Sequence, residues 1–270
     1  MGQRFGFFVQ MGLLPVRIVF SKPYFYPMEY FKIFLKNSAV LLNIVLLSGC
    51  ATHGQLIEDS LQTSVTENLR YYLYFPKDYE AETEKEFGLL LFLHGGGESG
   101  ADLEEIKKNG PPKLLVEGKQ FPFLVLAPQN PHEKRFWNIH AVNQLLDSVV
   151  AEYRVDKKRI YLTGLSRGGS AVWDMAVQYP EKFAALAVVC GMAPMPYAHW
   201  LDKDMPIWVF HGDQDPVIPV SESDHMVKKL EEMGHDVQYT RYEGVGHNSW
   251  AKAYTTEALY EWLNQQTRDD

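Results

Sequence analysis

The pentapeptide 164–168 (Gly-Leu-Ser-Arg-Gly) places a serine between two glycines, directly after the apolar segment 159–163 and before a helix-like segment. This G-x-S-x-G pattern, with a strand before it and a helix after it, is typical of a nucleophile on a tight strand-to-helix turn. Side chains at Gly164 and Gly168 would collide in such a turn, so both positions need glycine. The pattern predicts that Ser166 is a nucleophile; the alternative is a plain glycine-rich turn.

A carboxylate and a histidine follow the last two predicted strands. The strand 207–210 leads into a loop that contains Asp213 and Asp215, and the strand 237–242 leads into a glycine-rich turn that ends at His247. A serine nucleophile needs a base that takes its proton and a carboxylate that orients this base. Serine, acid and histidine in this chain order is one of the known arrangements. We therefore expect His247 to be the base.

The acid and the remaining histidines need a choice among candidates. Asp215 lies deeper in its turn, just before a proline, so it is the preferred acid, and Asp213 is expected to bond backbone amides of the loop. His94 follows a strand but is expected to be structural. His225 and His235 are expected on the surface, in a helix and in a turn.

A glycine-rich loop supplies candidate donors for a negative oxygen. The apolar run 88–93 leads into residues 94–98, His-Gly-Gly-Gly-Glu. Residues without side chains let backbone N–H groups approach a substrate oxygen closely. Together with the amide of Arg167, a donor from this loop would hold the oxyanion of a tetrahedral intermediate. Gly96 is the first choice for this donor and Gly97 the second; the alternative is a flexible turn.

The surrounding segments alternate between strands and helices. The predicted strands are 69–75, 88–93, 123–127, 159–163, 184–189, 207–210 and 237–242, and the predicted helices are 141–153, 169–178, 221–233 (capped by Ser221) and 251–265. Apolar, non-alternating strands between helices predict an α/β fold with a mostly parallel sheet of about seven or eight strands and helices on both faces. In such sheets the site lies beyond the carboxyl ends of the strands.

The site is expected to be open. The segment 191–206 is too short for a large lid domain, and no second domain is visible in the pattern. Trp137 and Trp250 are candidate substrate-binding residues, and Met192, Met195 and Tyr197 are further candidates for the pocket wall. For each of them the alternative is packing.

Composition and cysteine content argue against a nucleic-acid partner and against a metal site. The chain has 270 residues, 46% of them hydrophobic and 22% charged, with a net charge of -8. This composition is that of a globular protein, and without a basic stripe nucleic acid is not an expected partner. The only cysteines are Cys50 and Cys190. Cys190 ends a strand-like run and is expected to be a buried free thiol. No spacing of ligands indicates a metal site, and no cofactor is expected.

The N-terminal part has the features of an export signal. Met28 is followed by Lys32 and Lys36, then by the short apolar run 39–47. A basic region, a short apolar region and small residues before a cleavage point are typical of signal peptides, and the run is too short for a comfortable membrane span. The ending Leu-Ser-Gly-Cys at residues 47–50 resembles the lipobox of bacterial lipoproteins.

The resemblance to lipoproteins implies that Cys50 becomes a lipid-bearing N-terminus. Residue 51 is Ala where an Asp would favour the inner membrane, so we expect a lipid-anchored protein of the cell envelope, in the outer membrane. The alternative is an uncleaved hydrophobic anchor. The predicted parts are an upstream extension (1–27), a lipoprotein signal peptide (28–49), a tether (50–66) and a catalytic domain (67–270).

Residues 67–266 resemble compact α/β-hydrolases of the phospholipase/carboxylesterase and dienelactone-hydrolase type, including a bacterial branch labelled predicted peptidase or prolyl-oligopeptidase-like. The resemblance is carried by Leu-His-Gly-Gly-Gly-Glu (93–98), Gly-Leu-Ser-Arg-Gly-Gly (164–169), His-Gly-Asp-Gln-Asp (211–215) and Gly-His-Asn-Ser-Trp (246–250). It implies a serine ester hydrolase whose acid is the second aspartate of its loop, Asp215. Arg167 departs from the Met or Gln of many relatives, and its side chain is expected to alter the pocket charge.

The expected substrates are small esters or esters attached to a polymer, such as short or aromatic acyl groups on polysaccharide. Two alternatives remain open at this point. One is a serine peptidase that uses the same triad, and the other is a noncatalytic surface lipoprotein that has kept the fold. Fold alone does not decide among these functions. The oligomeric state does not follow from the sequence.

Overall fold

The structure is a computed structural model that describes residues 67–268. The predicted extension, signal peptide and tether (1–66) lie outside the described residues, and so does the predicted lipidation site, Cys50. None of the helices in the described part is long and apolar enough to cross a membrane.

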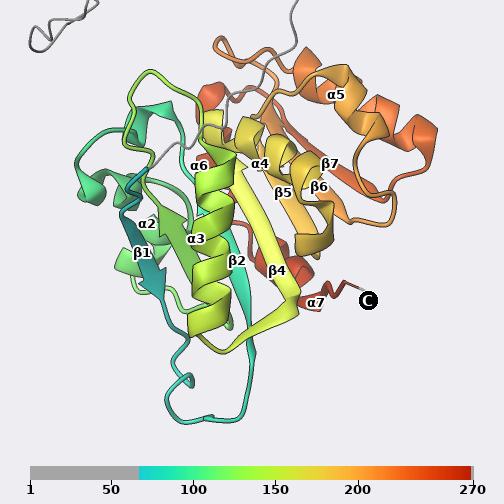
Figure 1. Cartoon of the computed structure of the whole chain (residues 1–270). Helices are drawn as coiled ribbons and strands as arrows, with labels where there is room; N and C mark the ends of the chain where they lie inside the picture. The colour runs from blue at the N-terminus through green and yellow to red at the C-terminus, as the bar shows by residue number, and fades with distance from the viewer. Residues whose placement is uncertain (1–66, 269–270) are drawn as a thin grey trace, which may run out of the picture. The chain divides into compact units, whose positions relative to one another are not determined.

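A seven-stranded sheet forms the centre of the described region (Figure 1). Its strands, in chain order, are β1 (Tyr71–Tyr74), β2 (Phe87–Leu93), β3 (Leu124–Pro128), β4 (Val155–Leu165), β5 (Ala185–Val189), β6 (Ile207–Gly212) and β7 (Val237–Tyr242). Their order across the sheet is β1-β3-β2-β4-β5-β6-β7. Strand β1 pairs antiparallel with β3, and all other pairs are parallel. The predicted mostly parallel sheet is confirmed.

Helices cover both faces of the sheet, which explains why apolar and polar residues do not alternate along the central strands. Every residue of β2, β3 and β5 is buried. The helices α3 (Ile139–Glu152), α4 (Arg167–Gln178) and α5 (Ser221–Met233) share one hydrophobic cluster with the sheet. The helices α2 (Gly110–Val116), α6 (Trp250–Ala253) and α7 (Glu257–Gln265) share a second cluster on the other face.

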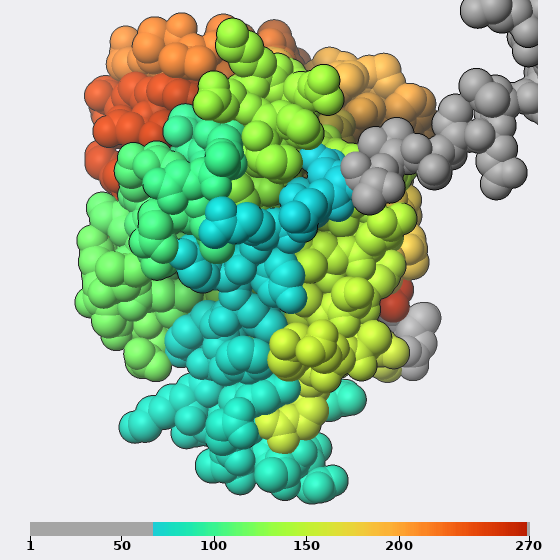
Figure 2. Space-filling view, turned by 60° about the vertical axis from the view of Figure 1, so that its left-hand side comes forward, coloured from blue at the N-terminus to red at the C-terminus, as the bar shows by residue number. Residues whose placement is uncertain are grey.

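One edge of the sheet is formed by β1, which lies on the surface of the face shown in Figure 2, in cyan; β7 forms the other edge. Its first residue, Tyr71, is 37% exposed. The loop between β1 and β2 projects at the lower end of the molecule in both views (Figures 1 and 2). The parallel strands end at the opposite side, so this loop is remote from the edge where the candidate site residues lie.

Two details of the predicted helices were wrong. The expected helix 251–265 is divided into α6 and α7, with Thr256 in an extended conformation between them. The hydroxyl groups of Thr255 and Thr256 donate to carbonyls of α6, which satisfies the end of that helix and stops it. Ser221 is not the cap of α5, because the backbone at Val220 is already helical. Helix α2 was not predicted, although its two prolines stand in the first turn, where proline is favoured; at seven residues it is too short for a clear apolar period.

Close contact between α4 and the chain after β5 requires glycine on both sides. A Cβ atom at Gly191 would lie 2.4 Å from the carbonyl carbon of Gly169, and one at Gly169 would lie 2.6 Å from the carbonyl oxygen of Val189. Both neighbours are backbone atoms, which cannot move aside as a side chain can. This contact holds the start of α4 against the centre of the sheet.

Gly191→Ala is therefore expected to lower the free energy of unfolding by about 3 kcal/mol, because overpacking forces the backbone apart. Urea unfolding, monitored by circular dichroism, measures this change. Gly97→Ala is the matched control, since a Cβ atom there would meet nothing within 4 Å. An unchanged urea midpoint for Gly191→Ala would show that the two segments do not pack as described.

Candidate active site

Ser166 lies on a strained turn between β4 and α4. Its φ is 53° and its ψ is -118°, a region that residues with side chains rarely adopt. A Cβ atom at Gly164 would lie 2.5 Å from the carbonyl oxygen of Gly168, and one at Gly168 would lie 1.9 Å from the carbonyl oxygen of Leu93. The predicted need for glycine at both positions is confirmed. The turn presents the serine hydroxyl at the carboxyl edge of the sheet.

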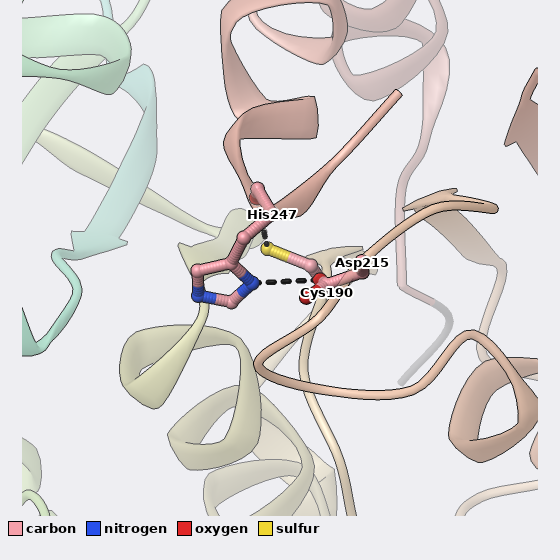
Figure 3. Close-up of side chains that lie close together, drawn as sticks. All are labelled: Cys190, Asp215 and His247. Carbon is pink, nitrogen blue, oxygen red and sulfur yellow. Dashed lines mark hydrogen bonds and ion pairs between the residues drawn. The ribbon is translucent and has the colours of Figure 1, made fainter. Parts of the chain in front are cut away.

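The structure brings Ser166, His247 and Asp215 together in one chain of hydrogen bonds. Ser166 Oγ lies 2.8 Å from His247 Nε2, and His247 Nδ1 lies 2.6 Å from Asp215 Oδ2. A carboxylate accepts only, so Nδ1 carries the proton and Nε2 accepts from the serine. Figure 3 shows the imidazole of His247 facing Asp215. This is the arrangement in which a histidine activates a serine hydroxyl.

Asp215, not Asp213, faces the histidine. Oδ2 of Asp215 faces His247, and its other oxygen, Oδ1, accepts hydrogen bonds from the amides of Val217 (2.8 Å) and Ile218 (2.9 Å). Burial acts to raise the pKa of Asp215, but the hydrogen bonds from His247 and these two amides outweigh it and lower the pKa below its usual value. Asp213 accepts a hydrogen bond from the amide of Gly244 (2.8 Å), which is the loop-stabilising role expected for it.

Trp250 joins His247 to a segment far away in the chain. Its ring stands nearly perpendicular to the imidazole, with the ring centres 5.2 Å apart. Its indole N–H donates to the side chain of Asn109 (3.0 Å), and the Asn109 amide group in turn donates to the buried Glu98. Asn109 and Glu98 were not among the predicted site residues, because no local pattern indicates such long-range contacts.

His94 braces the glycine-rich loop. Its Nδ1 donates to the carbonyl oxygen of Gly95 (2.7 Å), so its Nε2 accepts from the amide of Asn130 (3.0 Å). Burial lowers the pKa of His94, which favours this neutral form. The indole of Trp137 packs on the His94 ring and donates to the His94 carbonyl oxygen (3.2 Å). The expected structural role of His94 is confirmed.

Arg167 connects the glycine-rich loop to the loop after β3. Its Nη1 donates to the carbonyl oxygens of Glu133 (2.9 Å) and Arg135 (3.2 Å). The guanidinium lies against Gly96, where a Cβ atom would be 2.8 Å from Nη2, whereas Gly97 has open space around it. A side chain at Gly96 would therefore displace the end of the arginine side chain. The donation of the Gly96, Gly97 and Arg167 amides to an oxyanion stays a prediction.

Cys190 lies beneath the histidine as a buried free thiol, as expected. Burial raises its pKa to about 12, so the thiol stays protonated, and it donates to the carbonyl oxygen of His247 (3.5 Å). Cys190, Asp215 and His247 lie close enough together to suggest a metal site (Figure 3). The chemistry does not fit one, because both imidazole nitrogens are engaged and a protonated thiol is a poor ligand.

The apolar rim consists of exposed side chains on the loops that follow β3, β5 and β6. We use this name for Phe136 (58% exposed), Met192 (42%), Met195 (40%) and Val217 (64%). The three loops contact the start of α4 or the acid: the carbonyl oxygen of Arg135 accepts from Arg167, the amide of Met192 donates to Ser170, and the amide of Val217 donates to Asp215.

Other predicted residues lie elsewhere. Trp137 is only 7% exposed and packs in the core, which is the alternative that its sequence context left open; its neighbour Phe136 is on the surface instead. The hydroxyl group of Tyr197 donates a hydrogen bond to the carboxylate of Asp174 (2.9 Å). His225 is exposed, as expected, but His235 is buried at the end of α5, so its predicted surface position was wrong.

Asp215→Asn should reveal the pH range in which the carboxylate stabilises the fold. Because the pKa of Asp215 is lowered in the native state, its stabilisation is present above the unfolded value, near pH 4, and is lost as the pH falls through the lower native value. We expect a constant difference in unfolding free energy between wild type and variant above about pH 5, and a smaller one below about pH 4. Denaturant unfolding at each pH measures it; a difference that stays constant to pH 3 would contradict the lowered pKa.

Known proteins of similar sequence carry esterase names. The chain is 29% identical over 154 residues to a bifunctional acetylxylan esterase/xylanase of Neocallimastix patriciarum (54% of this chain, 22% of that protein). It is 23% identical over 167 residues to feruloyl esterase B of Neurospora crassa (57% of this chain, 54% of that protein). The chain thus spans between about a fifth and a half of the length of these relatives.

A solved structure and a family model extend this similarity. The crystal structure of a thermostable esterase matches with a TM-score of 0.65 and 36% identity, over 74% of this chain and 60% of the other. Residues 120–265 match the phospholipase/carboxylesterase family model, which covers more than half of the chain. With its parallel sheet, the serine turn after β4 and the histidine after β7, the chain belongs to the phospholipase/carboxylesterase family of α/β-hydrolases.

Proposed function

We propose that this protein hydrolyses carboxylic esters by acyl transfer through Ser166, His247 and Asp215. The observation that carries the proposal is the continuous chain of hydrogen bonds from the serine hydroxyl to the buried carboxylate. A noncatalytic protein would have no need to keep a serine in a strained conformation and a histidine aligned with it. The esterase names of the relatives support the same reaction class.

The proposed reaction has two steps. Ser166 Oγ attacks the ester carbonyl while His247 Nε2 takes its proton, and Asp215 stabilises the imidazolium that results. The amides of Gly96 and Arg167, with Gly97 as the other candidate, hold the oxyanion; each such donor lowers the barrier by roughly 3 kcal/mol. His247 then protonates the leaving alcohol. Water repeats the sequence on the acyl-enzyme and releases the acid.

The proposed substrates are esters of short or aromatic acyl groups, including those attached to polysaccharide. Two features support this class. The loop between β5 and β6 is short and forms no lid in the part of the chain that the structure describes, and the exposed apolar rim would contact a flat or apolar group next to the serine. Two relatives are named for such esters, one as an acetylxylan esterase and one as a feruloyl esterase.

The purified full-length protein should hydrolyse p-nitrophenyl acetate and butyrate, and Ser166→Ala should lower kcat by about 10⁴-fold or more, because the acyl-enzyme cannot form. Release of p-nitrophenol measures the rate. Cys190→Ala is the matched control: its thiol is protonated and donates to the backbone carbonyl oxygen of His247, not to the imidazole, so this variant should keep the activity.

Further substrates separate the rival functions. Release of acetate from acetylated xylan, or of ferulate from feruloylated oligosaccharide, would support the polysaccharide class. Hydrolysis of simple esters without either release would remove that class and leave the esterase. Turnover of peptide amides with no preference for esters would favour a serine peptidase. A protein that neither hydrolyses esters nor reacts with a serine-directed phosphonate would be noncatalytic.

We also propose that the mature protein begins at Cys50 and is anchored by lipid in the outer membrane of a bacterial cell envelope. The support is the sequence alone: a basic start, a short apolar run and the Leu-Ser-Gly-Cys ending of residues 47–50. A lipid anchor of this kind would hold the catalytic domain at the membrane without a spanning helix. It would bring the enzyme close to polymers outside the inner membrane.

In a bacterial host, the wild-type chain should incorporate an alkyne-labelled fatty acid and fractionate with outer membranes. Cys50→Ser should abolish labelling, because the lipid is attached through the sulfur, and Cys190→Ser is the control that keeps it. Labelling of both variants, or of neither variant nor the wild type, would contradict a lipid anchor at Cys50. Fractionation of the labelled wild type with inner membranes would contradict the proposed membrane alone.

A further inference from the structure

His211 is a second histidine at the acid loop and has no part in the proton transfers described above. It lies near the end of β6 and is completely buried. The loop 212–219 folds over it, so that its Nε2 lies 3.0 Å from the carbonyl oxygen of Ile218. Its Nδ1 lies 2.7 Å from the hydroxyl oxygen of Ser223 in α5. The imidazole therefore joins the end of a strand, the acid loop and the helix that follows.

These contacts determine where the proton of the His211 ring lies. A carbonyl oxygen only accepts, so Nε2 must carry the proton that it donates to Ile218. The neutral ring then offers Nδ1 as an acceptor, and Ser223 donates its hydroxyl proton to it. Both nitrogens are satisfied in this one tautomer, which is what a completely buried imidazole needs.

The protonated edge of His211 also faces the carboxylate of Asp215. His211 Nε2 lies 3.2 Å from Asp215 Oδ2, the same oxygen that accepts from His247 Nδ1. The side chains of His211 and Asp215 are both 0% exposed. In such a dry environment a partial positive charge at this distance interacts strongly with a carboxylate. The carboxylate is thus held between two imidazoles and, at its other oxygen, two amides.

We propose that His211 is a positioning residue, which holds the loop 212–219 so that Asp215 Oδ2 faces Nδ1 of His247. It touches no reacting atom and acts only through Asp215. The carbonyl contact at Ile218 stabilises the turn whose amides bind Asp215 Oδ1, and the contact at Oδ2 prevents the carboxylate from rotating away. Its effect on turnover rests on the proposed function, but its effect on the hydrogen bond between Asp215 and His247 does not.

Two substitutions at His211 separate the functions of its nitrogens. His211→Gln places a donor near the position of Nε2, and His211→Asn keeps only a group near the position of Nδ1. In the full-length protein, with active sites counted by a serine-directed phosphonate, His211→Asn should lower kcat per site on p-nitrophenyl acetate about 10-fold to 100-fold. KM should change less than about twofold, because no substrate contact is lost. His211→Gln should recover most of kcat, and His225→Asn, at an exposed position, should behave as wild type.

A second measurement does not depend on turnover. Proton NMR reports the Nδ1–H of His247 directly, as a low-field resonance. It should be present in wild type and His211→Gln, and absent or broadened in His211→Asn. Ser223→Ala removes only the hydroxyl that donates to Nδ1 of His211 and so helps to hold the ring, so it should weaken the same resonance with the fold intact, and Ser223→Thr should restore it.

The outcomes distinguish the two proposals. If His211→Asn keeps the resonance and its per-site kcat, His211 does not position Asp215 and the inference is overturned. If both His211 variants lose the resonance equally, the residue is structural only, which also overturns it. If wild type shows the resonance but hydrolyses no ester, the proposed function fails, while the comparison of the variants still decides the role of His211.

Discussion

The strained backbone of Ser166 is the constraint on which the arrangement of the site depends. A residue with a side chain at φ 53° needs support from its surroundings, and here the support is close backbone packing. The end of β2 approaches Gly168 so closely that a single added carbon would lie 1.9 Å from the Leu93 carbonyl oxygen. The residues that follow Leu93 form the glycine-rich loop. The contact that supports the serine turn therefore also places the candidate oxyanion donors beside it.

The acid and the base are held by close backbone packing together with side-chain hydrogen bonds. Their loops follow neighbouring parallel strands, β6 and β7, and the two backbones meet directly: the amide of Gln214 donates to the Val245 carbonyl oxygen (2.9 Å). A Cβ atom at Gly212 would lie 2.3 Å from that same oxygen. The sheet register thus brings the two loops together, and side-chain hydrogen bonds set the final orientation of Asp215 and His247. Both parts of the site thus need glycine at a close backbone contact, and the acid and base depend in addition on satisfied polar side chains.

These two kinds of contact explain how much of the molecule could be predicted from its sequence. All seven strands and the positions of the serine, acid and histidine follow local rules: apolar runs, glycines at fixed spacing and polar residues at strand ends. The break at Thr256, where threonine hydroxyls bond carbonyls of α6, and the short helix α2, which begins with prolines, have local causes that the spacing of apolar residues does not register. The link from Glu98 through Asn109 to Trp250 joins distant segments by side chains alone, so no pattern in one segment indicates it.

Arg167 contributes to the site through both its backbone and its side chain. Its backbone begins the helix after the nucleophile, where the helix dipole favours negative charge, and its amide is a candidate oxyanion donor. Its side chain crosses over Gly96 to the carbonyl oxygens of the loop that exposes Phe136. The expected effect of this arginine was on the charge of the pocket. The contacts show in addition that the guanidinium links the loop that carries Phe136 to the glycine-rich loop beside the serine.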